Sequence, residues 1–165
     1  MVMATEFRNA MSRLGAAVNV ITTDGPAGLG GFTASAVCSV TDSPPTLLVC
    51  INQSSFQYAR FEQNGVLCVN VLGADQEDVS RLFSGQIKAS IEERFAQTEH
   101  ERLDTGSPAL KGSLVCFDCA VDRIETVGTH GIFLCRVLHT WTQAQAAGLL
   151  YFDRAYHRVH ATCPA

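Results

Sequence analysis

Residues 31–52 read GFTASAVCSVTDSPPTLLVCIN, and this stretch predicts two consecutive strands separated by one turn. Residues 32–40 combine β-branched with small side chains, and residues 46–52 form an unbroken apolar run. The intervening residues 42–45 are Asp-Ser-Pro-Pro, and proline ends a strand because it lacks the backbone N–H donor. The apolar run also predicts that the second strand is covered on both faces.

The sequence on either side of this stretch extends the same pattern. The Thr5 hydroxyl is the expected N-cap of a first helix, and Ser54 and Ser55 are the expected caps of a second. Because strands outnumber helices and do not alternate with them, we expect a mainly β antiparallel barrel or sandwich with peripheral helices. Further strands are predicted over residues 16–23, 66–72, 114–127, 131–142 and 148–152, and helices over residues 5–14, 56–63, 75–83 and 91–95.

Length and composition indicate one domain and exclude several kinds of partner. The chain has 165 residues, which suits a single domain over residues 1–165. Its net charge is −4 and its lysines and arginines are scattered, so we expect neither nucleic acid nor a membrane as partner. No apolar run approaches the roughly 18 residues of a membrane span, and the first residues lack a signal-peptide pattern. We therefore expect a cytoplasmic protein.

The chain has seven cysteines, most of them among apolar neighbours. This odd number favours reduced, buried thiols over a disulfide scaffold. Cys116 and Cys119 form a C-x-x-C, a spacing that zinc and redox sites use. In the predicted strand, however, residues three apart point to opposite faces, and no second pair completes a four-ligand set. We therefore expect core packing for both cysteines and no metal site.

Two neighbouring segments could form the wall of a binding site. Residues 28–31 are Gly-Leu-Gly-Gly, which matches neither a dinucleotide fingerprint nor a phosphate-binding loop and is typical of a flexible loop. Residues 33–36 are Thr-Ala-Ser-Ala, and small side chains on a strand let a planar ligand approach the backbone. The two hydroxyls share a face because they lie two residues apart. The alternative is a tightly packed strand without a ligand.

Three further segments have a functional and an ordinary interpretation. Residues 52–56 precede a predicted helix, whose N-terminus could bind a phosphate or could simply be capped. His130 lies in a Gly-Thr-His turn, where it could contact a ligand or could be a surface residue. Residues 151–157 are aromatic and basic, so they could stack on a ring or could close the core.

Hydrolytic and acid–base machinery is not apparent in the sequence. There is no nucleophile elbow, no carboxylate pair and no H-E-x-x-H motif. Hydride transfer between two bound nucleotides requires mainly positioning, because the cofactors carry the chemistry. The candidate segments are compatible with that kind of reaction.

Several segments together resemble one known family. They are FRNAMSRLGAAVNVITTDGPAG (7–28), GFTASAVCSVTDSPPTLLVCIN (31–52), LCVNVL (67–72), IEERF (91–95), VGTH (127–130) and GLLYFDRAYH (148–157). With them the chain resembles the short-chain NAD(P)H:flavin reductases, the reductase components of two-component flavin-dependent monooxygenases. It is most similar to the reductases of 4-hydroxyphenylacetate 3-monooxygenase and of pyrimidine monooxygenase, and a cob(II)yrinate reductase branch is similar too. Many relatives carry a tryptophan after the EERF-like segment, whereas the only tryptophan here is Trp141.

The resemblance implies a Greek-key split barrel that binds FMN, forms a homodimer and transfers hydride from NADH or NADPH to FMN or FAD. Reduced flavin would then reach a separate oxygenase component by diffusion. His130 would be the catalytic residue beside the nicotinamide, and Tyr151 and Arg154 would contact the same nucleotide. The residues expected at the flavin are Thr33, Ala34, Ser35, Ala36, Cys50, Ile51, Asn52, Ser54, Ser55, Phe56, Phe83, Ser84 and Gly85.

Two rival functions remain open at the level of the sequence. A non-catalytic flavin carrier or sensor could use the same fold, although it would not need the Gly-Thr-His turn. A structural β-barrel interaction module would explain every candidate segment by its ordinary interpretation.

Overall fold

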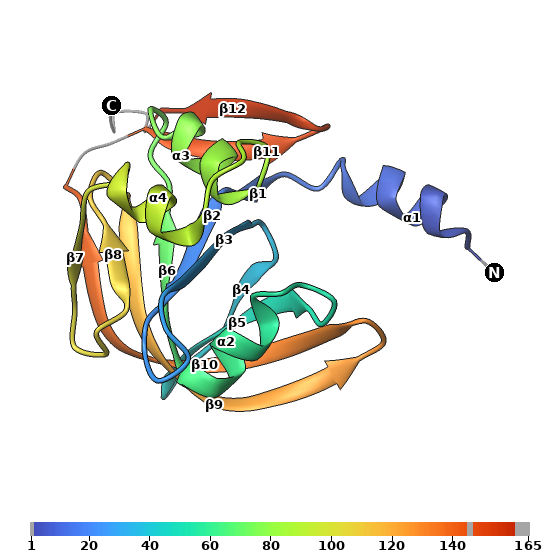
Figure 1. The fold of residues 1–165 in the computed structure, drawn as a ribbon. Coiled ribbons are helices and arrows are strands. Elements are labelled where there is room, and N and C mark those ends of the chain that lie inside the picture. Colours follow the sequence, from blue (N-terminus) through green and yellow to red (C-terminus); the bar gives the residue numbers. More distant parts are fainter. Residues whose placement is uncertain (1, 145–146, 161–165) are drawn as a thin grey trace.

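The computed structural model describes residues 2–144 and 147–160, and its main body is a seven-stranded antiparallel sheet (Figure 1). The strand order is β3-β2-β6-β9-β10-β5-β4, so β3 and β4, although consecutive in the chain, form opposite edges. The sheet curls until these edges meet, which gives a barrel that is split between β3 and β4 (Figure 1). The strands are β2 (Asn19–Thr23), β3 (Gly30–Ala34), β4 (Val37–Asp42), β5 (Pro45–Asn52), β6 (Val66–Val71), β9 (Val115–Val127) and β10 (His130–Thr142).

The long hairpin of β9 and β10 provides much of the curvature. Gly128 takes the left-handed φ of 56° that this tight turn requires. The pairing shifts register twice along the hairpin, between Leu134 and Cys135 and between Val137 and His139. Such irregularities increase the local twist and bend a strand, so the hairpin wraps around the barrel core.

The barrel core is filled from both the sheet and a helix. Ile21, Val49 and Phe133 are almost completely buried there, and Phe61 reaches the same cluster from α2 (Tyr58–Asn64). Gly65 ends this helix with a φ of 64°, as its Asn-Gly sequence indicates. The helix therefore closes one end of the barrel.

A second layer covers the other end of the barrel. Val18, Phe83, Phe95 and Leu149 form the centre of its own buried cluster. Figure 1 shows its small sheet and α3 at the top of the view and its β7–β8 hairpin at the left. It contains the three-stranded sheet of β1 (Ala16–Ala17), β11 (Gly148–Phe152) and β12 (Ala155–Val159), together with α3 (Glu77–Phe83), α4 (Ile91–Ala96) and the hairpin of β7 (His100–Arg102) and β8 (Pro108–Leu110).

The N-terminal helix α1 (Ala4–Met11) extends away from this body (Figure 1). None of its residues is buried, and Phe7 and Met11 are 60% and 45% exposed. Its N-cap is Met3, so the expected cap at Thr5 is wrong, and the helix ends three residues before the predicted position 14. An isolated helix of this length is marginal in water, and no side chain of α1 is buried against the rest of the described chain.

The mainly β architecture with peripheral helices is confirmed, but two predicted strands are each divided. The strand over residues 16–23 breaks at Val18, whose backbone bonds Leu149 on one side and Leu72 on the other, and so changes from the small sheet to the barrel. The strand over residues 32–40 breaks at Ser35 and Ala36, where the chain crosses from one barrel edge to the other.

Three further expectations differ from the structure. β5 alternates between buried and half-buried residues, so it is covered fully on only one face. The short strands β7, β8 and β12 were not predicted, because three- to five-residue strands carry little periodicity. Among the described residues, no helix is long and apolar enough to cross a membrane.

Candidate active site

A cavity of about 370 Å³ lies where β3, β5, β10 and the end of α3 converge. Its volume falls in the range of roughly 300–1,000 Å³ that is typical of small-molecule sites. Segments far apart in the sequence meet here because the two barrel edges come together at the split. The lining residues are Phe32, Thr33, Ala34, Ser35, Ala36, Cys50, Ile51, Asn52, Ser55, Phe83, Ser84 and His130.

The side chains of Thr33, Ala34, Ser35 and Ala36 form one side of the cavity, which we call the small-residue wall. The Thr33 hydroxyl donates to the Ser80 carbonyl oxygen at 2.6 Å, so this donor joins β3 to α3 and is not free for a ligand. Ser35 is exposed and is the wall's remaining hydroxyl. The wall therefore offers one side-chain donor rather than the two expected.

Gly31 allows the wall to pack closely against α3. A Cβ atom at this position would lie 2.8 Å from the Phe83 ring, closer than real Cβ contacts allow. Without that atom, β3 approaches Phe83, whose ring then both fills the second core and lines the cavity. A residue of the glycine-rich loop thus has a packing role that the flexible-loop interpretation did not contain.

His130 and Asn52 stand side by side on β10 and β5, because they are direct partners in the ladder. The His130 Nδ1 atom lies 2.9 Å from the Thr129 hydroxyl, which orients the ring and leaves Nε2 for a ligand. The Asn52 Oδ1 atom accepts hydrogen bonds from the backbone N–H and the hydroxyl of Ser54, both at 2.9 Å. The Asn52 amide can therefore offer its NH₂ group to a ligand.

The segment with Ser54, Ser55 and Phe56 is a turn rather than a helix start. Helix α2 begins at Tyr58 with Gln57 as N-cap, so the expected caps at Ser54 and Ser55 are wrong. The Ser55 hydroxyl instead accepts from the Gln57 N–H at 3.3 Å within the turn. Ser55 lines the cavity, whereas Ser54 does not and Phe56 is 79% exposed.

The lining of this cavity carries little charge. Burial raises the pKa of the Cys50 thiol, so this cysteine stays neutral near pH 7. Among the described residues that line the cavity there is no lysine, arginine or carboxylate. No group of three potential metal ligands occurs in the part of the chain that the structure describes. The lining thus presents hydroxyl, amide, thiol and imidazole groups to a ligand and no lysine, arginine or carboxylate.

A second cavity of about 220 Å³ adjoins the first and shares Thr33, Ala34, Ser35 and Ser84 with it. Tyr151 lines it from β11. The sequence reasoning missed two of its polar residues, Ser80 and Gln86, whereas Tyr156 belongs to the candidate segment 151–157. The Tyr156 hydroxyl lies 2.8 Å from the Ser80 hydroxyl, which joins β12 to α3. The four-residue spacing of Ser80 and Ser84 on one helix face was the available signal.

Two further expected residues, besides Ser54 and Phe56, lie outside both cavities. Arg154 has a left-handed φ of 62° in the β11–β12 turn, and its guanidinium donates to the Asn9 side chain at 2.6 Å. Gly85 follows Ser84 with a φ of 82° and contributes no side chain. The structure therefore brings together eleven of the predicted residues in one cavity and Tyr151 in the next, but not Ser54, Phe56, Gly85 or Arg154.

Comparison with known proteins gives one consistent family. The family described as "Flavin reductase like domain" matches residues 11–160. A curated relative from Serratia proteamaculans (strain 568), named FMN reductase (NADH) RutF, is 57% identical over 152 residues, which cover 92% of this chain and 86% of the relative.

Solved structures agree with this assignment. A candidate flavin reductase from Haemophilus somnus 129PT superposes with a TM-score of 0.92 at 46% identity and covers 96% of this chain and 100% of its own. The NADH:FAD oxidoreductase SgcE6 of Streptomyces globisporus C-1027, in complex with NAD and FAD fragments, gives a TM-score of 0.88 at 25% identity and covers 97% and 94% of the two chains. The split-barrel fold is confirmed, and the chain belongs to the flavin reductase-like family.

Proposed function

We propose that this chain is an NADH-dependent FMN reductase that passes reduced flavin to a separate oxygenase. The observation that carries the proposal is the uncharged cavity in which the small-residue wall faces His130. FMN and NADH are favoured over FAD and NADPH because the Serratia relative, more than half identical to this chain, is named for them.

The flavin ring is proposed to lie against the small-residue wall. Small side chains let a flat ring approach the backbone closely, as a larger Cβ substituent would not. The Ser35 hydroxyl and the Asn52 NH₂ group are the donors available to the polar edge of the ring. Phe83 and Ser84 would lie beside the chain that extends from the flavin ring. The second cavity adjoins the first at Ser84.

The flavin phosphate is proposed to bind near Ser54, Ser55 and Phe56 through hydroxyl groups rather than a helix N-terminus. The backbone N–H groups of Ser54 and Ser55 already donate to the Asn52 side chain and carbonyl. Helix α2 has only seven residues and starts beyond them. The Ser55 hydroxyl is the cavity-lining donor of this turn.

The nicotinamide is proposed to lie on the open side of the flavin, next to His130. When both nucleotides are bound, a hydride passes from C4 of the nicotinamide to N5 of the flavin. The protein contributes by holding these atoms roughly 3–3.5 Å apart. His130 Nε2 would bind the nicotinamide amide, while Thr129 holds the imidazole in place. Tyr151 would contact the same nucleotide from the adjoining cavity.

A homodimer is part of the same proposal. An apolar cavity of about 360 Å³ beside β4 includes Val37, Leu47, Phe117 and Val137. The helix α1 presents an uncovered apolar side chain at Phe7. A second copy that covers both features would bury apolar surface that a monomer leaves in water. The six free thiols of the described residues support a reducing compartment such as the cytoplasm.

The function is tested by anaerobic reduction of FMN, FAD and riboflavin with NADH or NADPH, followed as flavin bleaching. We expect turnover that is fastest with FMN and NADH. The His130→Ala variant should raise the KM for NADH up to about tenfold, the worth of one hydrogen bond, and change FMN affinity less. His139→Ala is the control, because this exposed histidine lies outside both cavities. Flavin that is bound but never reduced would identify a carrier instead.

A further inference from the structure

Two cysteine thiols meet between the neighbouring strands β6 and β9. Asn70 pairs directly with Cys116, and Cys68 lies two residues from Asn70 on the same face of β6. The sulfur atoms of Cys68 and Cys116 lie 3.6 and 3.3 Å from the same acceptor, Oδ1 of Asn70. Both thiols therefore converge on one oxygen atom, well outside the cavity assigned to flavin.

The partner of Cys116 is not the cysteine that its C-x-x-C spacing suggests. Cys119 points to the opposite face of β9 and belongs to the barrel core around Phe133. Burial is the main cause that raises the pKa of its thiol. Cys119 is thus an inert core residue, and the pair is formed across the strands by Cys68 and Cys116.

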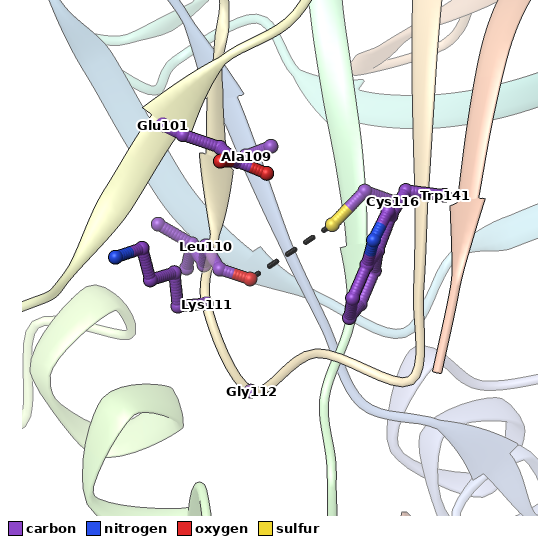
Figure 2. A pocket seen from close by; sticks show the side chains of 7 residues that line it. All are labelled: Glu101, Ala109, Leu110, Lys111, Gly112, Cys116 and Trp141. Atoms are coloured by element: carbon purple, nitrogen blue, oxygen red, sulfur yellow. Dashed lines mark hydrogen bonds between the residues drawn. The ribbon is translucent and has the colours of Figure 1, made fainter. Parts of the chain in front are cut away.

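Cys116 borders a cavity of about 300 Å³, whereas Cys68 does not. Figure 2 shows the Cys116 sulfur next to the Trp141 side chain, with Glu101 and Lys111 on the opposite side of the cavity. Trp141 is the direct ladder partner of Cys116 on β10. Although Cys116 is only 2% exposed, a molecule small enough to enter this cavity reaches its sulfur first.

The surroundings of the pair activate one thiol and keep the other neutral. The neighbouring Cys68 thiol is the main cause that lowers the pKa of the Cys116 thiol; burial opposes this, and the nearby Ser113 hydroxyl lowers the pKa further. The same interaction with Cys116, together with burial, raises the pKa of Cys68. The Ser113 hydroxyl is buried and has no hydrogen-bond partner among the described residues. A thiolate at Cys116 would accept its proton.

We propose that Cys116 and Cys68 are a peroxide-reactive pair, in which Cys116 attacks hydrogen peroxide and Cys68 resolves the product. The Cys116 thiolate displaces hydroxide from peroxide and becomes a sulfenic acid. The Cys68 thiol then displaces the sulfenic hydroxyl, so a disulfide forms and one water leaves. Two thiols are oxidised and one peroxide is reduced to water.

The source of peroxide in the cell rests on the proposed function, because reduced flavin that escapes an oxygenase reacts with oxygen and yields hydrogen peroxide. The thiol chemistry itself does not depend on it, since peroxide can be added directly. A protein that reduces no flavin yet forms the disulfide would overturn only the proposed function. A flavin reductase that leaves Cys116 unoxidised would overturn only this pair.

The primary test treats the full chain with hydrogen peroxide and maps its peptides by mass spectrometry. We expect a disulfide between Cys68 and Cys116, formed before the buried Cys119 or Cys135 is oxidised. In Cys68→Ser, a sulfenic acid should persist at Cys116 and be trapped by a 1,3-diketone. In Cys116→Ser, Cys68 should stay reduced. A wild-type map without the linkage sinks the proposal, whether or not either variant folds.

Trp141 gives a second, independent measurement, since it is the chain's only tryptophan and the cross-strand neighbour of Cys116. Peroxide should reduce its fluorescence, and a dithiol reductant should restore it. The exposed Cys38 supplies the matched control, so Cys38→Ser should behave as the parent. A fluorescence change that survives in Cys116→Ser would assign the effect to another residue.

Discussion

Cys50 and Cys116 each line a cavity of this barrel, yet the pKa values of their thiols are shifted in opposite directions. Burial raises the pKa of Cys50 in the candidate active site. Cys116 is the more buried of the two, but the neighbouring Cys68 thiol and Ser113 hydroxyl lower its pKa. Burial alone makes a thiol less acidic, and donors aimed at the sulfur reverse this. The cavity with Cys50 therefore has a neutral thiol and is suited to positioning a ligand, whereas the cavity with Cys116 contains the thiol proposed to react.

The strongest way to break this comparison is to fill the first cavity and leave the second intact. Ala36 is exposed on the small-residue wall, so Ala36→Trp adds bulk without disturbing the core. We expect flavin reduction to fall about 100-fold or more, because the ring can no longer reach its position. Steady-state NADH oxidation with FMN measures this loss.

Peroxide reactivity at Cys116 should be unchanged in the same variant. A matched bulky substitution at the exposed Ala155 on β12 should leave flavin reduction near the parental rate. If Ala36→Trp reduced FMN normally, the small-residue wall would not be the ring's binding surface.

A smaller effect is expected where the wall packs against α3. In Gly31→Ala the new Cβ meets the Phe83 ring at 2.8 Å, so one of the two must move. We expect a loss of about 1–3 kcal/mol in the free energy of unfolding, as for other overpacked cores. Chemical denaturation measures it, with Gly15→Ala as control because its nearest contact is an ordinary 3.8 Å. Equal stability of both variants would contradict the close approach.

The sequence predicted most strands, because these depend on local signals. Three features are each encoded within a few residues: the paired strands around residues 42–45, the Asn-Gly helix end and the His130 turn. The resemblance then placed Cys50, Asn52 and Phe83 near the small-residue wall, and the structure brings them into one cavity.

The remaining features depend on contacts between distant residues. The predicted strand divides at Val18 because the Val18 N–H donates a hydrogen bond to the carbonyl of Leu149, far along the chain. The Cys68–Cys116 pair needs the register of β6 on β9, which no local pattern carries, so the C-x-x-C spacing pointed to the wrong partner. The Thr33 hydroxyl donates to the Ser80 carbonyl oxygen, and this contact also forms only when β3 and α3 pack together in the folded chain.

Thiol labelling sharpens the comparison between Cys50 and Cys116, because exposure and acidity predict opposite orders of labelling for the two thiols. Cys50 is the more exposed residue, so a reaction controlled by access modifies it first. A reaction controlled by thiolate content instead favours Cys116 near neutral pH, by about tenfold for each unit by which its thiol pKa lies below that of Cys50. Peptide-level kinetics with a small methanethiosulfonate reagent decide the order. As the pH rises, the Cys116 rate should level off below the ordinary cysteine pKa, and the Cys50 rate above it.

The smallest expected effect isolates one donor. Ser113→Ala removes a buried hydroxyl that lowers the pKa of Cys116 and leaves the larger influence of Cys68 in place. The pKa of Cys116 should then rise, and its labelling rate near neutral pH should fall about threefold to tenfold. Ser107→Ala is a closely matched control, because its hydroxyl is equally buried and equally without a partner among the described residues but is not among the groups that shift the pKa of Cys116. A general loosening of the barrel would raise the Cys116 rate in both variants, so only a fall confined to Ser113→Ala supports a directed hydrogen bond.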